Sequence, residues 1–221
     1  MLPRVPDLAL VCLGSLAFSV CSACAKGAGS RLGTFPKVLI RSVLLTIYSL
    51  ATTDGSRQAL QSPNRRLLLQ RGTFGFLALA LYWHAGHVLP LANLAVISRF
   101  HPLLSALLCS RIYSDEPVPA SFVVALLSAF AGVAVVASPQ LTAGATAWGS
   151  ALAVAAAVFT SGAFVTVREL NRRGTPAAAT IFAFHFCGAV LAALCCALFP
   201  ATGTADGHSW DGLVPSRAEF L

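Results

Sequence analysis

Arg99 is the residue of this sequence whose type and position point most clearly to chemistry. It is the only charged residue between Arg71 and Arg111, in a stretch that is otherwise uncharged and largely apolar. If that stretch crosses a bilayer, Arg99 falls near the middle, where a cation is costly unless it faces a polar cavity or a partner. The predicted chemistry is binding of a carboxylate or phosphate group, which suits a guanidinium. The alternative is that Arg99 bonds only to backbone carbonyls, including one freed by a kink at Pro102.

Four histidines in or beside apolar stretches are further candidates, because they are the only side chains there that titrate near neutral pH. They are His84, His87, His101 and His185. His84 and His87 share one face of a helix, whereas His101 lies about 200° around the helix from Arg99. Since a metal site needs more ligands than HxxH supplies, we expect these histidines to pack between helices. A proton relay is the alternative.

The apolar stretches lack the residue sets on which catalysis depends. None contains an aspartate or glutamate, and the chain has no GxSxG, HExxH, P-loop or dinucleotide-binding fingerprint. We therefore expect no enzyme activity, no catalytic residues, no cofactor and no metal ion. The seven cysteines lie in apolar stretches and their number is odd, so we interpret them, including the CxxC of Cys21 and Cys24, as packing residues.

The composition identifies lipid as the solvent for most of the surface. Of the 221 residues, 57% are hydrophobic and only 10% are charged, which is too few charges to cover a soluble globule. The 15 lysines and arginines lie mostly in short gaps between apolar stretches. This pattern is typical of membrane topology signals and not of a phosphate-binding face, so the lipid bilayer is an expected partner and nucleic acid is not.

Stretches long enough to cross about 30 Å of hydrocarbon predict an all-α, multi-pass membrane bundle with about seven crossings. Pro90 divides one long stretch, and the turn-rich segment Ser138 to Ala145 divides another. The predicted crossings are Leu8–Ala25, Phe35–Thr53, Gly72–Val88, Leu91–Ile112, Ala120–Ala137, Thr146–Val165 and Pro176–Phe199. More cations flank the amino-terminal side, so the amino terminus is expected to be cytoplasmic. A cleaved signal peptide ending near Ala23–Ala25 is the alternative to the first crossing.

Two similar segments indicate an internal repeat. Ser30–Pro36 (SRLGTFP) and Asn171–Pro176 (NRRGTP) each lead into an apolar stretch. The simplest account is a five-helix unit over residues 8–137, followed by an incomplete second copy over residues 146–221. Because five is odd, the second copy would insert upside down, which is a common construction in secondary transporters. The chain ends in Ser216–Leu221, which looks like the lead-in to an eighth helix.

A set of short motifs runs through the first unit in a particular order and spacing. They are Arg41, Arg71–Gly72, Gly75–Phe76, Leu89–Ala92, Val96–Ser98, Pro102–Leu103, Glu116 and Gly132–Val133. In these the chain resembles the EamA branch of the drug/metabolite transporter superfamily, which includes solute carrier 35-like proteins. The resemblance implies ten helices in two inverted five-helix repeats and transport by alternating access. Arg99–His101 departs from it, because the family usually has small or hydroxylated residues there.

The resemblance also implies a role for Arg41 in lining the cavity or clamping the repeats. Its position alone, about a turn inside its stretch, suits a side chain that snorkels to the interface. We expect a small polar or anionic metabolite to contact six residues, with the third and fourth crossings lining its path. These residues are Arg99, Arg41, His84, His87, His101 and Pro102.

A different function follows if the second repeat is truncated. An inverted-repeat cavity needs both halves, so the chain would then be a non-transporting assembly partner, a regulatory product or an inactive remnant. A homo-oligomer is a further expected partnership, beside the bilayer and a small-molecule solute.

Overall fold

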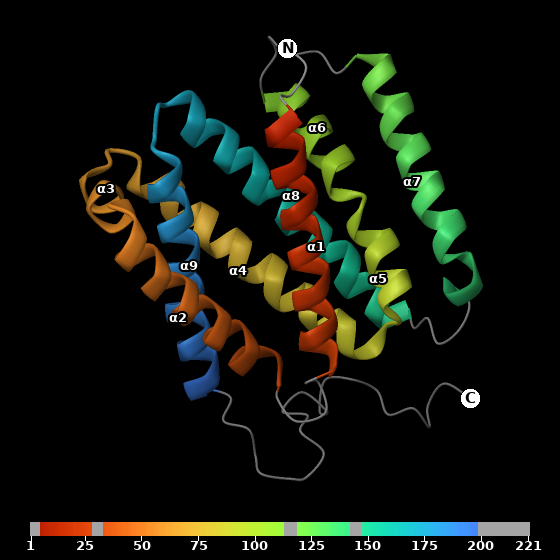
Figure 1. Cartoon of the computed structure of the whole chain (residues 1–221), viewed down its shortest axis with the longest axis horizontal. Helices are drawn as coiled ribbons and strands as arrows, with labels where there is room; N and C mark the ends of the chain where they lie inside the picture. The colour runs from red at the N-terminus through yellow and green to blue at the C-terminus, as the bar shows by residue number, and fades with distance from the viewer. Residues whose placement is uncertain (1–4, 28–32, 113–118, 142–146, 199–221) are drawn as a thin grey trace. The chain divides into compact units, whose positions relative to one another are not determined.

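The computed structural model describes residues 5–27, 33–112, 119–141 and 147–198, and every regular element within these ranges is an α-helix (Figure 1). In chain order the helices are α1 (Val5–Gly27), α2 (Thr34–Thr52), α3 (Gly55–Gln61), α4 (Arg65–Val88), α5 (Leu91–Ser98), α6 (His101–Ile112), α7 (Ala120–Leu141), α8 (Ala147–Arg172) and α9 (Ala177–Leu198). The predicted all-α class is confirmed. Glu116 and the segment Ser216–Leu221 lie outside the described ranges.

The chain divides into two compact units, which we describe separately. One comprises residues 1–33 and 201–221, of which α1 is the described helix, and the other comprises residues 34–200 with α2–α9. Helix α1 coincides with the predicted first crossing and contains the shorter apolar stretch Cys12–Cys24. Its Ser19 and Ser22 hydroxyls donate to carbonyls four residues earlier, which satisfies these polar groups within the helix.

Four helical segments of the second unit are long and apolar enough to cross a bilayer, and the protein is an integral membrane protein. They are Thr34–Thr52, Leu91–Ile112, Ala147–Arg172 and Ala177–Leu198, at the predicted second, fourth, sixth and seventh crossings. Helices α4 and α7 lie at the third and fifth predicted crossings but are not among these four. The total of seven crossings therefore stays a prediction.

Several helices extend beyond the predicted crossings, because they continue past the charged and polar residues that we used as the ends of the crossings. Helix α4 begins at Arg65 and not at Gly72, and α8 continues to Arg172 and not only to Val165. Helix α7 continues to Leu141, so the first residues of the expected turn at 138–145 are helical. A backbone that bonds internally keeps its hydrogen bonds beyond the apolar region, and charged side chains at its ends reach the interface.

The second unit places small residues inside and large apolar residues outside, as expected for a bundle solvated by lipid. Helix α4 packs along α8 and α9, and α2 packs along α9 (Figure 1). A Cβ atom on Gly72 of α4 would lie only 2.5 Å from Cys187 Cβ of α9, so this close approach requires glycine. The outer surface carries exposed Ile47, Val158 and Val190.

The fourth predicted crossing is interrupted in its middle. Helix α5 ends at Ser98 and α6 begins at His101, with Arg99 and Phe100 between them. The Phe100 N–H donates to the Ile97 carbonyl at 3.1 Å, three residues back, so the chain tightens there before α6 resumes. A broken membrane helix is the arrangement that secondary transporters use around solute sites.

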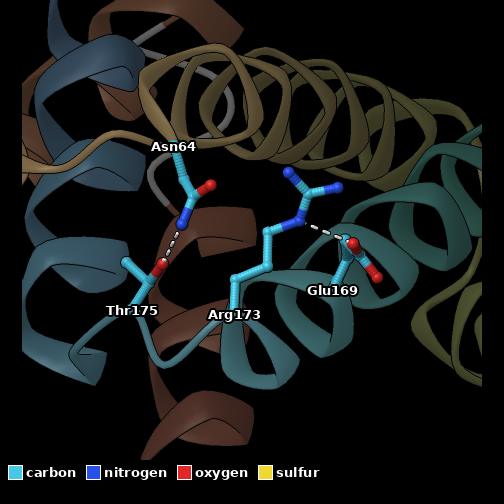
Figure 2. A network of polar contacts seen from close by, with 4 residues as sticks. All are labelled: Asn64, Glu169, Arg173 and Thr175. Carbon is cyan, nitrogen blue, oxygen red and sulfur yellow. Dashed lines mark hydrogen bonds and ion pairs between the residues drawn. The ribbon is translucent and has the colours of Figure 1, made fainter.

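The turn between α8 and α9 is held by a left-handed glycine and by side chains of three segments. Gly174 has φ +68°, and the Thr175 N–H donates to the Leu170 carbonyl at 3.0 Å, which closes the end of α8. Figure 2 shows the Asn64 side-chain amide donating to Thr175 Oγ1 at 3.0 Å. Glu169 and Arg173 form an ion pair at 2.6 Å along α8. This turn is the predicted start of the last crossing.

Candidate functional site

Arg99 lies exposed in the break between α5 and α6. Its backbone N–H donates toward the Ala95 and Val96 carbonyls, at 3.3 and 3.1 Å, so the backbone of the break is bonded while the side chain is accessible. The guanidinium is therefore available to a solute on the surface of the second unit. Its role as an anion contact stays a prediction.

His101 replaces the hydrogen bond that Pro102 removes. Proline has no N–H, so the Ser98 carbonyl, four residues before Pro102, lacks its usual helical donor. His101 Nδ1 lies 2.6 Å from this carbonyl oxygen, and because a carbonyl can only accept, Nδ1 carries the proton. The carbonyl expected to be freed by Pro102 is thus satisfied by His101 and not by Arg99.

The same residue ties the break to α8. Ser161 is fully buried, and its one hydroxyl proton is shared between the His101 carbonyl at 3.0 Å and the Ala157 carbonyl at 2.8 Å. The His101 ring stacks on Phe164, with centroids 5.4 Å apart and planes at 12°. These contacts of His101, together with the donor that Pro102 lacks, shape the helix break in which Arg99 lies.

His84 and His87 face α2, where two polar pairs bridge the helices. Lys37 Nζ donates to His87 Nε2 at 3.1 Å, and Thr34 Oγ1 lies 3.5 Å from His84 Nδ1. Both helices contribute residues three positions apart, so the pairs stack one turn above the other. Lys37 is only 7% exposed, although the sequence placed it at the mouth of its crossing. The expected polar packing of these histidines between helices is what the structure shows.

Arg41 lies in a different cluster, where α2, α4 and α9 meet. The Cζ atoms of Arg41 and Arg71 lie 5.9 Å and 4.4 Å from the centroid of the Phe184 ring, so two guanidinium groups approach one aromatic ring. Buried His185 follows Phe184, and the two ring centroids are 4.8 Å apart. A Cβ on Gly75 would lie 2.5 Å from an Arg71 Nη atom, so this glycine makes room for the guanidinium. Arg71, which precedes the third predicted crossing, is inside α4.

The cations of the second unit greatly outnumber the carboxylates that the structure describes there. These carboxylates are Asp54, which is exposed, and Glu169, which pairs with Arg173. Within the described part of the chain, no group of three or more His, Cys, Asp or Glu side chains is arranged to hold a metal ion. The described charged side chains of α2, α4 and α9 are therefore all cations.

The six residues expected to contact solute fall into three places. Arg99, His101 and Pro102 form the helix break, His84 and His87 pair with α2, and Arg41 lies beside Phe184. The sequence reasoning did not predict the roles of Lys37 and Arg71, and it did not include His185 among the six expected solute contacts. One signal was present: Lys37 and Arg41 are four residues apart and share a helix face.

Comparison with known proteins gives one family and two distant relatives. The model of the EamA-like transporter family matches residues 7–138. Pseudopaline exporter CntI from each of two strains of Pseudomonas aeruginosa is 30% identical over 166 residues, which is 74% of this chain. The chain spans 57% of the length of these curated relatives. No solved structure matches significantly.

Proposed function

We propose that this chain, which belongs to the EamA-like transporter family, carries a small polar or anionic metabolite across a membrane by alternating access. The observation that supports this most is the broken helix α5–α6 with Arg99 exposed in the gap. Discontinuous helices line the solute sites of many secondary transporters, and in this break the accessible group is the Arg99 side chain. The division into a first repeat over 8–137 and an incomplete inverted copy over 146–221 is part of the same proposal.

Arg99 is the residue that we assign to an anionic group of the solute. Charge-assisted hydrogen bonds contribute about 1.5–3 kcal/mol, which corresponds to a roughly tenfold to hundredfold change in affinity. His101 contributes by holding the break, since its contacts are to Ser98 and α8, and Pro102 contributes by removing the backbone donor there. The relative CntI is named as an exporter of pseudopaline, and this name supports a small metabolite as the solute of this chain.

The test is efflux from proteoliposomes that contain the purified chain and a mixture of succinate, inorganic phosphate, glycine and choline. We expect loss of succinate or phosphate to exceed that from protein-free vesicles. Arg99→Gln should weaken the apparent affinity for this anion roughly tenfold or more. The matched control is Arg66→Gln, another exposed arginine, which lies near the start of α4 and should not change the affinity.

Two outcomes would contradict the proposal in different ways. Equal efflux from wild type and Arg99→Gln vesicles would remove Arg99 from the solute path. No efflux of any solute from a folded chain would favour the second function, a non-transporting assembly partner, regulatory product or remnant. Cross-linking in the membrane would show whether transport, where it occurs, accompanies a homo-oligomer.

A further inference from the structure

We propose that Arg71, Arg41 and His185 form a second anion site, which binds a carboxylate or phosphate group of the solute where α2, α4 and α9 meet. This inference rests on the proposed function, because it gives that transport function a binding site inside the bundle. The site is separate from the break at Arg99, since none of its residues belongs to α5 or α6.

The geometry brings positive charge from separate helices to one point. Arg41 comes from α2 and Arg71 from α4, and both guanidinium groups approach Phe184 of α9 at 5.9 and 4.4 Å. A ring face attracts a cation, and the Nε–H at the edge of the Arg71 guanidinium has no acceptor among the described residues. Gly75 lets the Arg71 guanidinium and the Phe184 ring pack directly against α4, since a Cβ there would lie 2.5 Å from Arg71 Nη and still closer to the ring. Two cations that approach one ring inside a bundle repel each other, and an anion bound beside them would offset that repulsion.

Two buried polar atoms in the cluster lack partners within the described residues. Arg71 Nε and His185 Nδ1 are both buried and make no hydrogen bond there. The His185 residue as a whole is 8% exposed. Leaving such groups unsatisfied away from water is costly, so they mark a place where a ligand can bind. An oxyanion can accept from Arg71, and from His185 when Nδ1 carries the proton.

A purely structural role makes a different prediction. If the arginines only clamp α2 and α4 to α9 through the Phe184 ring, adding an anion leaves the stability of the protein unchanged. If they form a binding site, the matching anion binds the folded state and raises the melting temperature with the logarithm of 1 plus its concentration over Kd. The phosphate of an anionic lipid shares this chemistry, so the lipid source must be tested beside the soluble one.

The experiment is thermal unfolding of the full chain, purified in detergent, with succinate, inorganic phosphate or neutral succinamide at matched ionic strength. At a hundredfold excess over Kd, we expect succinate or phosphate to raise Tm by roughly 5–10 °C, and succinamide to have no effect. Arg71→Gln should weaken binding up to about a hundredfold and reduce the shift at the same concentration to roughly 1 °C. The control Arg66→Gln, on the same helix and exposed, should keep the full shift.

Further variants keep the test valid if Arg71→Gln does not fold. Arg71→Lys keeps the charge but loses the planar fork, so we expect a clearly reduced shift. Phe184→Leu removes the ring but keeps both arginines, so the basal Tm should fall while the response to anion remains. A full response in Arg71→Lys and Arg71→Gln, or no response to either anion in the wild type, would overturn the site.

The result is separable from the transport assay. Anion-dependent stabilisation lost in Arg71→Gln supports the site even if no solute crosses proteoliposomes. Transport of a neutral or cationic solute, with no anion stabilisation, overturns the site and leaves transport standing. Stabilisation by phosphatidylglycerol that Arg71→Gln abolishes, with no response to succinate or phosphate, would overturn the solute site and assign the cluster to a lipid headgroup.

Discussion

Replacing His101 by phenylalanine tests whether this histidine supplies the hydrogen bond that Pro102 removes. Phenylalanine keeps the aromatic contact with Phe164 but has no donor for the Ser98 carbonyl. A buried acceptor left unsatisfied costs about 1–3 kcal/mol. For a chain of this size, each kcal/mol corresponds to roughly 2–4 °C in melting temperature. We therefore expect His101→Phe to lower Tm by about 2–12 °C.

The second arm of the experiment restores the donor from the backbone. In Pro102→Ala, the new N–H can donate to the Ser98 carbonyl as in a regular helix, so His101 becomes dispensable. The double variant His101→Phe/Pro102→Ala should therefore be more stable than the sum of the single changes predicts, with a coupling energy of about 1–2 kcal/mol. Thermal unfolding of the four proteins in one detergent measures this cycle.

Efflux of the anionic solute is a second measurement on the same variants. A continuous helix from Leu91 to Ile112 would move Arg99 out of the break, so we expect Pro102→Ala to reduce efflux of the anionic solute even where its stability is unchanged or higher. If the Tm changes of the two single variants simply add in the double variant, His101 does not supply the hydrogen bond that Pro102 lacks. Unchanged efflux in a demonstrably stable Pro102→Ala protein would refute the importance of the break.

Two other contacts lead to predictions of stability. Gly72→Ala should lower Tm by about 2–12 °C, because the new methyl group meets Cys187 at 2.5 Å and overpacking costs about 1–3 kcal/mol. The control is Gly14→Ala, whose new methyl group meets nothing within 4 Å and should leave Tm equal or higher. In the α2–α4 pair, Lys37→Met should leave Tm equal or higher, since it removes a buried charge, whereas His87→Ala should lower Tm by leaving the ammonium without its imidazole acceptor. Thermal unfolding measures both, and a Lys37→Met protein less stable than His87→Ala would contradict the second.

Much of the helical order could be predicted from the sequence because helices in lipid are specified locally. Long uncharged stretches predicted α8 and α9, an apolar stretch that carries Lys37 and Arg41 predicted α2, and Pro90 correctly separated α4 from α5. The break at Arg99–Phe100 was not predicted, although Pro102 suggested a kink there. A proline allows several local outcomes, and the contacts of His101 with Ser98 and of Ser161 with the His101 carbonyl select this one.

By itself, the sequence determined that the chain is an all-helical membrane protein, since charge spacing and hydropathy depend only on neighbouring residues. It also indicated the transporter family through the motifs of the first repeat. Only the tertiary structure decided that Lys37 meets His87 and that Arg71 meets Phe184. The reason is physical: a helix that is apolar towards both lipid and protein shows little amphipathic periodicity, so its sequence does not reveal which face packs inward. That face is set by small residues such as Gly72 and Gly75, whose partners on α9 lie more than a hundred residues away in the chain.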